Sequence, residues 1–349
     1  MAHTNSRADI EATMAIAIEA AESARGFSTP NPAVGAVILA TDGTIAGVGM
    51  TQPPGGPHAE IVALRQAGAA ARGGTAVVTL EPCNHQGRTG PCSQALIDAG
   101  VSTVHYAVDD PNPAAAGGAA TLQAAGIRVT GGIGSEAASR GALRAWLHKQ
   151  RTGRPHITWK YAATLDGRSA AADGTSQWIT GPAARGRVHE DRAKLDAVVV
   201  GTGTVVADDP WLTARMPDGS LAARQPLRVV VGTRDIPASS RILDDAAPTL
   251  HLRTRDVHEV IDTLTDLTDV LIEGGPTLAG AFLAADAVDR IQAFVAPAIL
   301  GAGAAAVGDA GVQTIAEARR FSRESVETIG PDILLSLIRD SGPGVGRQE

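Results

Sequence analysis

The sequence has 349 residues, which is more than one hydrophobic core usually supports, so we expect two domains. An apolar fraction of 44% and a charged fraction of 19% are ordinary for a globular chain, and no run of about 18 apolar residues predicts a membrane span. The formal net charge of −7 argues against a protein that binds nucleic acid over a broad surface, because such surfaces are usually basic.

The N-terminal stretch MAHTNSRADIEATM lacks the basic-then-apolar order of a secretory signal. The chain contains only two cysteines, so a disulfide framework is excluded, although a single Cys83–Cys92 bridge is compatible with the sequence. Without an export signal, we expect a cytoplasmic protein whose cysteines are free thiolates.

The first part of the chain alternates helix and strand signals. Ile10, Met14 and Ile18 recur at i, i+4 and i+8, which predicts an amphipathic helix over 8–24. A Thr-Asp-Gly turn predicts a hairpin between the next two strands. These and the following predicted elements are strands at 33–40 and 44–50, a helix from about 57 to 68, a strand at 75–80, a helix at 93–100, a strand at 101–108, a helix at 121–126 and a strand at 127–132. Such alternation is typical of a layered α/β domain.

A second alternating series follows the basic, turn-rich stretch HKQRTGRP, so we expect residues 148–154 to be a linker between domains at 1–147 and 155–340. The end of the chain, 341–349, is predicted to be a disordered tail. Between them lie candidate strands at 157–165, 197–202, 227–233, 248–253, 269–275 and 290–296, candidate helices at 181–195, 258–267 and 277–286, and two strands around a Gly-Pro-Asp turn within 324–340.

Both cysteines lie in one short window, PCNHQGRTGPC, at 82–92, and HAE upstream places His58 and Glu60 at the start of a predicted helix. One imidazole and two thiolates form a zinc ligand set that leaves a fourth position for water. Zinc lowers the pKa of bound water toward about 7 and makes hydroxide available at neutral pH. We therefore predict His58, Cys83 and Cys92 as metal ligands. Glu60, which is not a ligand, is predicted to carry the proton to the leaving nitrogen, as in zinc base deaminases.

Other interpretations of these residues stay open at this point. His85 could supply a fourth ligand, which would close the site and make it a structural zinc knuckle. A histidine and a glutamate at a helix start can also be ordinary surface side chains, and cysteine is often a small core residue. The HxE spacing, the proline before Cys83 and the confinement of both cysteines to one window favour a catalytic site.

HAE and EPCNHQGRTGPC, together with PNPAVGAV at 30–37 and DPNP at 110–113, resemble the deaminase half of the bifunctional deaminase–reductases of riboflavin biosynthesis. The long spacing between the cysteines departs from most zinc deaminases and matches this family. The resemblance implies a cytidine-deaminase-like three-layer domain. Thr51 stands where the family usually has histidine, so the loop TQPPGG is expected to hold the substrate differently. The residues implied to contact a phosphorylated ribosylaminopyrimidine are Asn31, His85, Arg88, Asp110 and Asn112.

Two glycine-rich stretches in the second half are candidate nucleotide- or phosphate-binding segments. VVVGTGTVVADDP, at 198–210, is a weak dinucleotide fingerprint because Val206 stands in place of the third glycine. IEGGPTLAG, at 272–280, predicts a strand that ends in Gly-Gly before a helix. Backbone N–H groups at such a helix start can bind a phosphate, although an ordinary strand–helix turn has the same pattern.

KYAATLDGRSA, SQWITG, GTGTVVADDPWLTAR and IEGGPTLAGAF are spaced as in the reductase half of the same family. This resemblance implies a dihydrofolate-reductase-like domain, NADPH as its cofactor and a homo-oligomer formed through it. The implied NADPH contacts are Ala162, Trp178, Thr204, Asp208, Thr233, Gly275, Pro276, Thr277, Leu278, Ala279, Gly280 and Ala281. The implied contacts to the sugar-phosphate substrate are Ser176, Arg192, Leu212, Arg215 and Glu273, and the two arginines suit a phosphate.

The resemblance of both halves to this family implies that the chain catalyses two consecutive steps of riboflavin biosynthesis. The first is zinc-dependent hydrolytic deamination of 2,5-diamino-6-(5-phosphoribosylamino)pyrimidin-4(3H)-one, and the second is NADPH-dependent reduction of the ribosyl side chain to ribityl. The alternative is a zinc deaminase that acts on a nucleic-acid base and carries an appended binding domain. An aromatic fraction of 3% and the negative net charge favour the small-molecule substrate. A zinc-stabilised binding protein without activity is a third interpretation, which Glu60 argues against.

Overall fold

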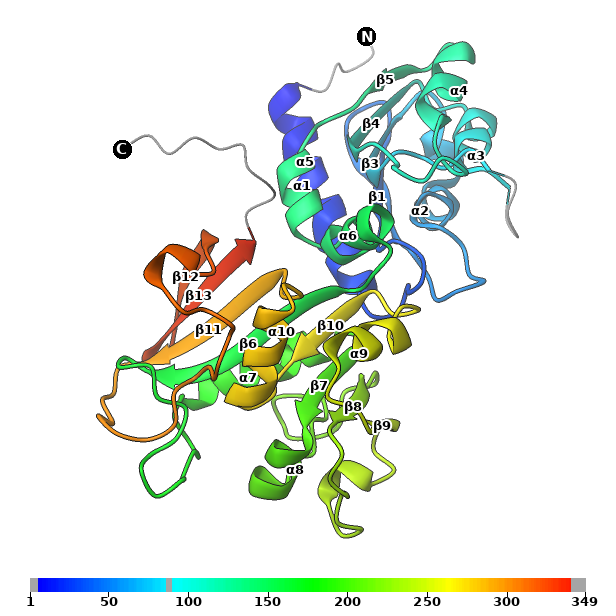
Figure 1. The fold of residues 1–349 in the computed structure, drawn as a ribbon. Coiled ribbons are helices and arrows are strands. Elements are labelled where there is room, and N and C mark those ends of the chain that lie inside the picture. The colour runs from blue at the N-terminus through cyan, green and yellow to red at the C-terminus, as the bar shows by residue number, and fades with distance from the viewer. Residues whose placement is uncertain (1–5, 86–89, 340–349) are drawn as a thin grey trace. The chain divides into compact units, whose positions relative to one another are not determined.

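The structure, a computed structural model, describes residues 6–85 and 90–339. Two compact units divide the chain at residues 154 and 155. Each unit is built on a β-sheet of its own with helices packed against it (Figure 1). Within the described residues, none of the helices combines the length and the apolar character that crossing a bilayer requires.

The sheet of the first unit has five strands in the order β2-β1-β3-β4-β5. Strand β1 runs antiparallel to its two neighbours, β2 and β3, whereas β3, β4 and β5 run parallel to one another. The strands are β1 Gly35–Leu39, β2 Ile45–Met50, β3 Thr75–Leu80, β4 Thr103–Val108 and β5 Arg128–Thr130. β1 is buried along its whole length, as expected for a strand covered on both faces.

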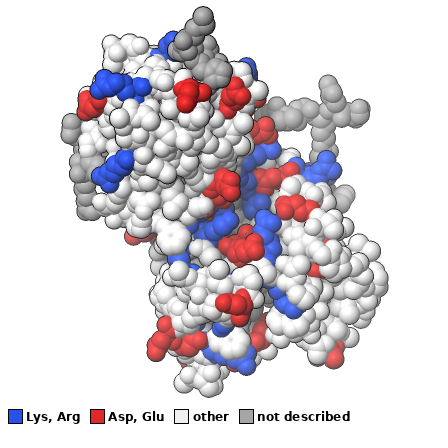
Figure 2. Space-filling view, turned by 180° about the vertical axis from the view of Figure 1, so that it is seen from behind, with Lys and Arg blue, Asp and Glu red and all other residues white. Residues whose placement is uncertain are grey.

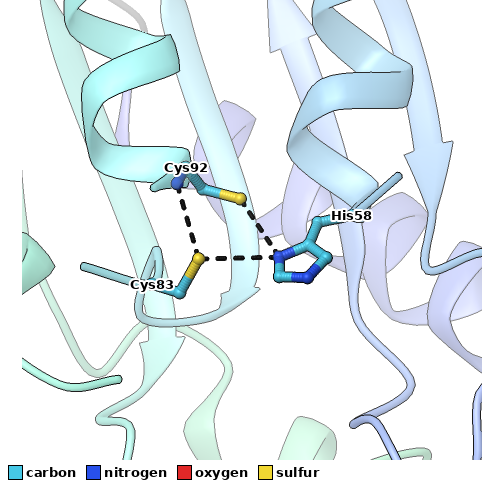
Figure 3. A group of neighbouring side chains, drawn as sticks. All are labelled: His58, Cys83 and Cys92. Atoms are coloured by element: carbon cyan, nitrogen blue, oxygen red, sulfur yellow. Dashed lines mark hydrogen bonds between the residues drawn. The ribbon is translucent and has the colours of Figure 1, made fainter. Parts of the chain in front are cut away.

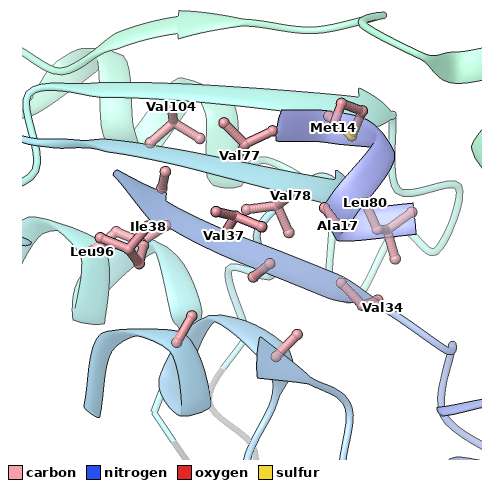
Figure 4. Close-up of a cluster of buried hydrophobic side chains, with 14 of the residues drawn as sticks. Met14, Ala17, Val34, Val37, Ile38, Val77, Val78, Leu80, Leu96 and Val104 are labelled. Carbon is pink, nitrogen blue, oxygen red and sulfur yellow. The ribbon is translucent and has the colours of Figure 1, made fainter. Parts of the chain in front are cut away.

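Helices cover both faces of this sheet, with α1 and α5 on one side and α2, α3 and α4 on the other (Figure 1). The helices are α1 Arg7–Ala24, α2 Ala59–Ala67, α3 Cys92–Ala99, α4 Gly118–Ala124, α5 Ser135–Arg140 and α6 Arg144–Thr152, with a 3₁₀ turn at Gly68–Ala71. Figure 4 shows part of the resulting core, in which Met14 of α1, Ile38 of β1 and Leu96 of α3 are fully buried. The unit is therefore a three-layer α/β domain, as predicted.

The predicted linker is wrong for residues 148–152, which form the second half of α6. The stretch HKQRTGRP looks polar by itself, but the helix begins four residues earlier and buries Ala145, Trp146 and His148. It ends at Gly153 in the left-handed conformation that favours glycine. The final helix therefore belongs to the first unit. The predicted tail at 341–349 lies outside the described residues.

The second unit contains an eight-stranded sheet in the order β12-β13-β11-β6-β10-β7-β8-β9. The six strands from β11 to β9 are parallel, and β12 and β13 form an antiparallel hairpin at one edge. The strands are β6 His156–Thr164, β7 Ala197–Gly201, β8 Leu227–Val231, β9 Thr249–Leu252, β10 Asp269–Ile272, β11 Arg290–Ala296, β12 Phe321–Ile329 and β13 Asp332–Arg339.

Alternate residues of β7 show that both faces of this sheet are covered. Val199 packs with Val260 of α9 and Phe282 of α10, whereas Val198 and Val200 pack on the opposite face with Val205 of α8. The helices are α7 Pro182–Arg192, α8 Thr202–Asp208, α9 Val257–Thr263 and α10 Pro276–Ala284, with 3₁₀ turns at Arg241–Leu243 and Ile315–Glu317. The carboxyl ends of the parallel strands share one edge, which is where open α/β sheets bind ligands.

Position 118, at the start of α4, must be glycine because the backbone there packs directly against Pro82, the residue before Cys83. A Cβ on Gly118 would lie 1.7 Å from the carbonyl oxygen of Pro82. We expect Gly118→Ala to lower the free energy of unfolding by about 1–3 kcal/mol and to weaken metal retention, because Pro82 must move. Urea unfolding and metal analysis measure the two effects. Gly186→Ala is the control, since its added methyl group meets open space; equal stability of both variants would contradict the prediction.

Candidate active sites

Three predicted ligands meet at one end of the first unit. His58 is the N-cap of α2, Cys92 is the first residue of α3, and Cys83 lies in the loop after β3 (Figure 3). The Nδ1 atom of His58 lies 3.5 Å from Sγ of Cys83 and 3.3 Å from Sγ of Cys92. Both cysteines are free, so the bridge that the sequence allowed is not formed.

These distances fit a zinc ion. Zn–S bonds of about 2.3 Å and Zn–N bonds of about 2.05 Å in tetrahedral geometry place a sulfur and a nitrogen about 3.6 Å apart. The potential ligand group found among the described residues consists of His58, Cys83 and Cys92, whose ligand atoms lie within 4.8 Å of one another. His85 is not a member of this group. Three protein ligands leave the fourth position that a catalytic zinc requires.

Glu60 follows His58 on the first turn of α2 and is only 4% exposed. Burial, reinforced by the negative charge of Cys83, raises the pKa of its carboxyl group to about 7. A hydrogen bond from Cys92 lowers the pKa of the Cys83 thiol below its usual value, and the same interaction raises the pKa of Cys92. In the absence of a metal, the two sulfurs therefore share one proton, which a cation would displace.

A cavity of about 250 Å³ opens beside these ligands. It is lined by His58, Cys83 and Glu60, and by four of the residues predicted to contact substrate, namely Asn31, His85, Asp110 and Asn112. The fifth, Arg88, lies outside the described residues. The sequence did not predict the lining side chains Glu81, Trp146 and Gln150, of which the last two come from α6.

Hydrogen bonds fix the shape of this cavity. The buried carboxylate of Glu81 accepts hydrogen bonds from the backbone N–H groups of Asp110, at 3.2 Å, and Ala119, at 2.9 Å. Asp110 in turn accepts from the backbone N–H of Asn112 at 2.9 Å. Thr51 is buried, and its hydroxyl accepts from the backbone N–H of Val34 at 3.0 Å. Asp110 and Asn112 thus form a turn that presents their side chains to the cavity, and Thr51 supports its wall.

We expect Cys92→Ala to lose bound zinc on dialysis. Apparent binding free energies of about 10–16 kcal/mol for a four-ligand zinc site imply that one ligand is worth a hundred- to thousandfold in affinity. Metal analysis and competition with a chelator measure the loss. Ser23→Ala is the control, because Ser23 is an exposed residue of α1 whose hydroxyl donates to the carbonyl oxygen of Glu19 in the same helix. Full zinc retention by Cys92→Ala would show that Cys92 is not a ligand.

The second unit contains a cavity of about 520 Å³ next to the carboxyl ends of β6, β7 and β10. It brings together nine of the residues predicted to bind NADPH or substrate: Ala162, Ser176, Trp178, Arg192, Thr204, Asp208, Leu212, Arg215 and Glu273. The hydroxyl of Ser176 lies 3.2 Å from the carboxylate of Asp208. The remaining lining residues include Lys160, Arg185 and Arg241, which the sequence did not single out.

A buried charge cluster forms the floor of this cavity. Arg192 donates two hydrogen bonds to the carboxylate of Glu273, at 2.6 and 2.9 Å, and Lys160 Nζ lies 3.6 Å from the same carboxylate. Burial alone would raise the pKa of Glu273, but the charges of Arg192 and Lys160 outweigh it and lower this pKa to about 2. Desolvation lowers the pKa of Lys160. The cluster holds a fixed carboxylate that can accept hydrogen bonds from a sugar.

A third cavity, of about 340 Å³, lies between α10 and the loops that follow β7, β8 and β9. Four further predicted NADPH contacts line it, namely Thr233, Thr277, Leu278 and Ala281. Gly275 donates its N–H to Thr204 Oγ1 at 3.1 Å, which joins this side of the unit to the larger cavity. Ala279 and Gly280 are buried in the core, and neither these two residues nor Gly275 and Pro276 line the two cavities of this unit.

Acidic and basic side chains are interspersed on the face of the molecule in Figure 2. A protein that grips a nucleic-acid backbone usually gathers Lys and Arg into a patch or stripe. The mixed charge on this face, with the net charge of −7, favours small-molecule substrates over a nucleic acid.

Two protein-family models match the sequence, one in each unit. Residues 7–108 match the cytidine and deoxycytidylate deaminase zinc-binding region, and residues 155–335 match the RibD C-terminal domain. The first match includes His58, Glu60 and both cysteines, and the second covers more than half of the chain. The fold prediction of a deaminase-like domain followed by a reductase domain is thereby confirmed.

Relatives resemble the chain along almost its entire length. The riboflavin biosynthesis protein RibD of Mycobacterium tuberculosis H37Rv is 58% identical over 94% of this chain and 97% of its own. The solved structure of Acinetobacter baumannii RibD, form 1, is 39% identical with a TM-score of 0.84, covering 96% and 100% of the two chains. A diaminohydroxyphosphoribosylaminopyrimidine deaminase/5-amino-6-(5-phosphoribosylamino)uracil reductase of Thermotoga maritima is 32% identical with a TM-score of 0.87, covering 96% and 99%.

Proposed function

Because the chain belongs to the RibD family of riboflavin biosynthesis proteins, we propose a role for each cavity residue in the family's two reactions. The enzyme is bifunctional: it deaminates a pyrimidine with a zinc site and reduces a ribosyl side chain with NADPH. We assign the deaminase to the first unit and the reductase to the second. The proposed domain boundary is the end of α6, at Thr152, rather than residue 147.

In the deaminase, His58, Cys83 and Cys92 hold the metal. When bound, zinc supplies Lewis acidity that lowers the pKa of a coordinated water to about 7. Glu60 accepts the proton of the attacking water and delivers it to the departing amino nitrogen, so that ammonia leaves. Its burial beside the ligands raises the pKa of its carboxyl group, which suits a group that takes up a proton and returns it.

The substrate of this step is the phosphorylated ribosylaminopyrimidine, bound by Asn31, His85, Asp110 and Asn112, with Arg88 at the phosphate. The cavity of about 250 Å³ that gathers the first four residues next to Glu60 supports this assignment. Asp110 and Asn112 offer an acceptor and an amide to the polar edge of a pyrimidinone. Thr51, which is buried and bonded to Val34, replaces the family's usual histidine, so it contributes to the cavity wall rather than to charge.

In the reductase, NADPH supplies the hydride when bound. Ala162, Trp178, Thr204, Asp208, Thr233 and the 275–281 segment contact the cofactor, of which Thr277, Leu278 and Ala281 are the cavity-lining members. Ser176, Arg192, Leu212, Arg215 and Glu273 orient the ribosyl phosphate. Arg215 is free to pair with the phosphate, because among the described residues its guanidinium bonds only to the carbonyl oxygen of Gly219 and stacks on Trp211.

The single observation that carries this function is the trio His58, Cys83 and Cys92 beside buried Glu60, in a chain whose second unit carries the Arg192–Glu273 cavity. The test is a paired assay on the purified chain with stoichiometric zinc. The diaminopyrimidinone ribosyl phosphate should release ammonia first and then consume NADPH in equal amount. NADPH consumption without ammonia release, or a chain that shows neither ammonia release nor NADPH consumption, would contradict the proposal.

A homo-oligomer formed through the reductase unit remains a prediction. Analytical ultracentrifugation of the purified chain measures it.

A further inference from the structure

The third cavity contains two arginines that none of the roles above uses. Arg234 follows β8 and Arg255 follows β9, and both line the cavity between these loops and α10. Within the described residues, neither guanidinium has a hydrogen-bond or ion-pair partner, and both are exposed. Arg253 differs from both, since it lies outside this lining and pairs with Asp235 at 2.5 Å. Two free cations that converge on one concave site attract a doubly charged anion.

Backbone geometry directs the loop after β8 toward the cavity. Gly232 has φ of +135°, and a Cβ there would lie 2.5 Å from Thr202 Oγ1, so only glycine fits. The carbonyl oxygen of Gly232 lies 2.9 Å from His251 Nε2 and its N–H bonds to Leu252. The turn is thus held to β9 and to the start of α8, and Thr233 and Arg234 continue along the cavity wall.

The described lining of this cavity has no carboxylate to accept a hydrogen bond from the ribose 2′-hydroxyl of NADH. Sites selective for NADH use a carboxylate to accept the ribose 2′-hydroxyl, whereas an arginine accommodates the 2′-phosphate of NADPH. None of the described residues that line this cavity is Asp or Glu. The nearest acids in sequence are engaged elsewhere, because Asp235 pairs with Arg253 and Asp256 caps α9 through the N–H of His258.

We propose that Arg234 and Arg255 bind the 2′-phosphate of NADPH and so set the preference of the reductase for NADPH over NADH. Thr277, Leu278 and Ala281 of α10 form the opposite wall, and Gly275, just before this helix, donates its N–H to Thr204, which lines the larger cavity of the unit. This arrangement lets one dinucleotide extend from the reducing centre to the two arginines. The inference rests on the proposed placement of NADPH in the second unit.

The test is calorimetric titration of the full chain with adenosine 2′,5′-bisphosphate and with AMP, which differ by the 2′-phosphate. Wild type should prefer the bisphosphate. Arg234→Ala and Arg255→Ala should each weaken bisphosphate binding about 10-fold and together about 100-fold, because each removes a charge-assisted contact. AMP binding should stay within twofold. In steady state, the double variant should raise the KM for NADPH, keep kcat and keep its activity with NADH.

The matched control is Arg320→Ala/Arg323→Ala. It removes two exposed positive charges of the same unit that have no hydrogen-bond or ion-pair partner in the described part of the chain and line none of the three cavities described above. It should leave the bisphosphate preference unchanged. An unchanged preference in Arg234→Ala/Arg255→Ala, or a raised KM for the pyrimidine substrate instead of NADPH, would overturn the inference. A wild-type chain that binds neither nucleotide would overturn the proposed cofactor site as well.

Discussion

Glu60→Gln is expected to lower ammonia release by roughly 10³- to 10⁴-fold while the zinc content stays at wild-type level. The amide keeps the shape of the side chain but can no longer take up and return the proton, a role that is usually worth about 10²–10⁴ in rate. Glu60 is buried beside the metal ligands without belonging to the ligand group, so its loss should leave the metal bound. Ammonia release and metal analysis on the same preparation measure both parts.

The second unit provides an internal control for this variant. When the deaminated intermediate is supplied directly, Glu60→Gln should oxidise NADPH at the wild-type rate, because the two cavities lie in separate compact units. Loss of both activities would count against two independent sites. Loss of zinc together with activity would show that Glu60 acts on the metal site rather than on the proton.

Arg192→Met should produce the opposite pattern, with reductase kcat/KM reduced about 10²- to 10³-fold and ammonia release unchanged. The variant leaves the carboxylate of Glu273 buried with only Lys160, and breaking a buried pair typically costs about 3–5 kcal/mol. Arg192→Lys should recover part of the stability but not the double hydrogen bond. Urea unfolding and NADPH oxidation with the deaminated intermediate measure these effects.

The pH dependence of stability separates this cluster from ordinary surface charge. The pKa of Glu273 is about 2 in the fold, below its usual value, so its stabilising contribution is present above pH 4.5 and is lost as the pH falls toward 2. In Arg192→Met the pKa rises, and the loss should begin at a higher pH. Arg187→Met, on the same helix, removes half-exposed pairs and should cost less than about 1 kcal/mol. Equal acid sensitivity in both variants would refute the explanation.

The metal ligands could be predicted because their identity is local. HxE and the two-cysteine window specify residue types within short stretches, and the strands and helices that bring them together have strong periodicity, as α1, β1 and β3 do. The hairpin predicted at the Thr-Asp-Gly turn is confirmed by the antiparallel pair β1 and β2. The sequence did not predict helices α5, α6 and α8. Resemblance to a family, rather than spacing alone, identified Asn31 and Asp110, which the structure places in the same cavity.

The sequence could not reveal which residues far apart in the chain contact one another in the fold. Lys160 is part of a strand that reads as buried, and nothing near it in the chain indicates that Glu273 lies opposite. The 275–281 segment was predicted as one block, but the helical repeat turns Ala279 into the core and leaves Thr277 and Leu278 at the cavity. The polar stretch from His148 onward forms the second half of a helix that its own residues do not predict. The helix is stabilised by tertiary packing of residues such as Trp146, which a local sequence pattern does not show.

Helix α6 determines how the first reaction could be separated from the second. The matched deaminase region ends at residue 108, yet Trp146 and Gln150 of α6 form part of the wall around the reacting centre. A stand-alone catalyst cut at 108, or at 147, would therefore be left with an open side. A shortened gene product that is meant to keep the deaminase activity therefore has to include the chain through Thr152.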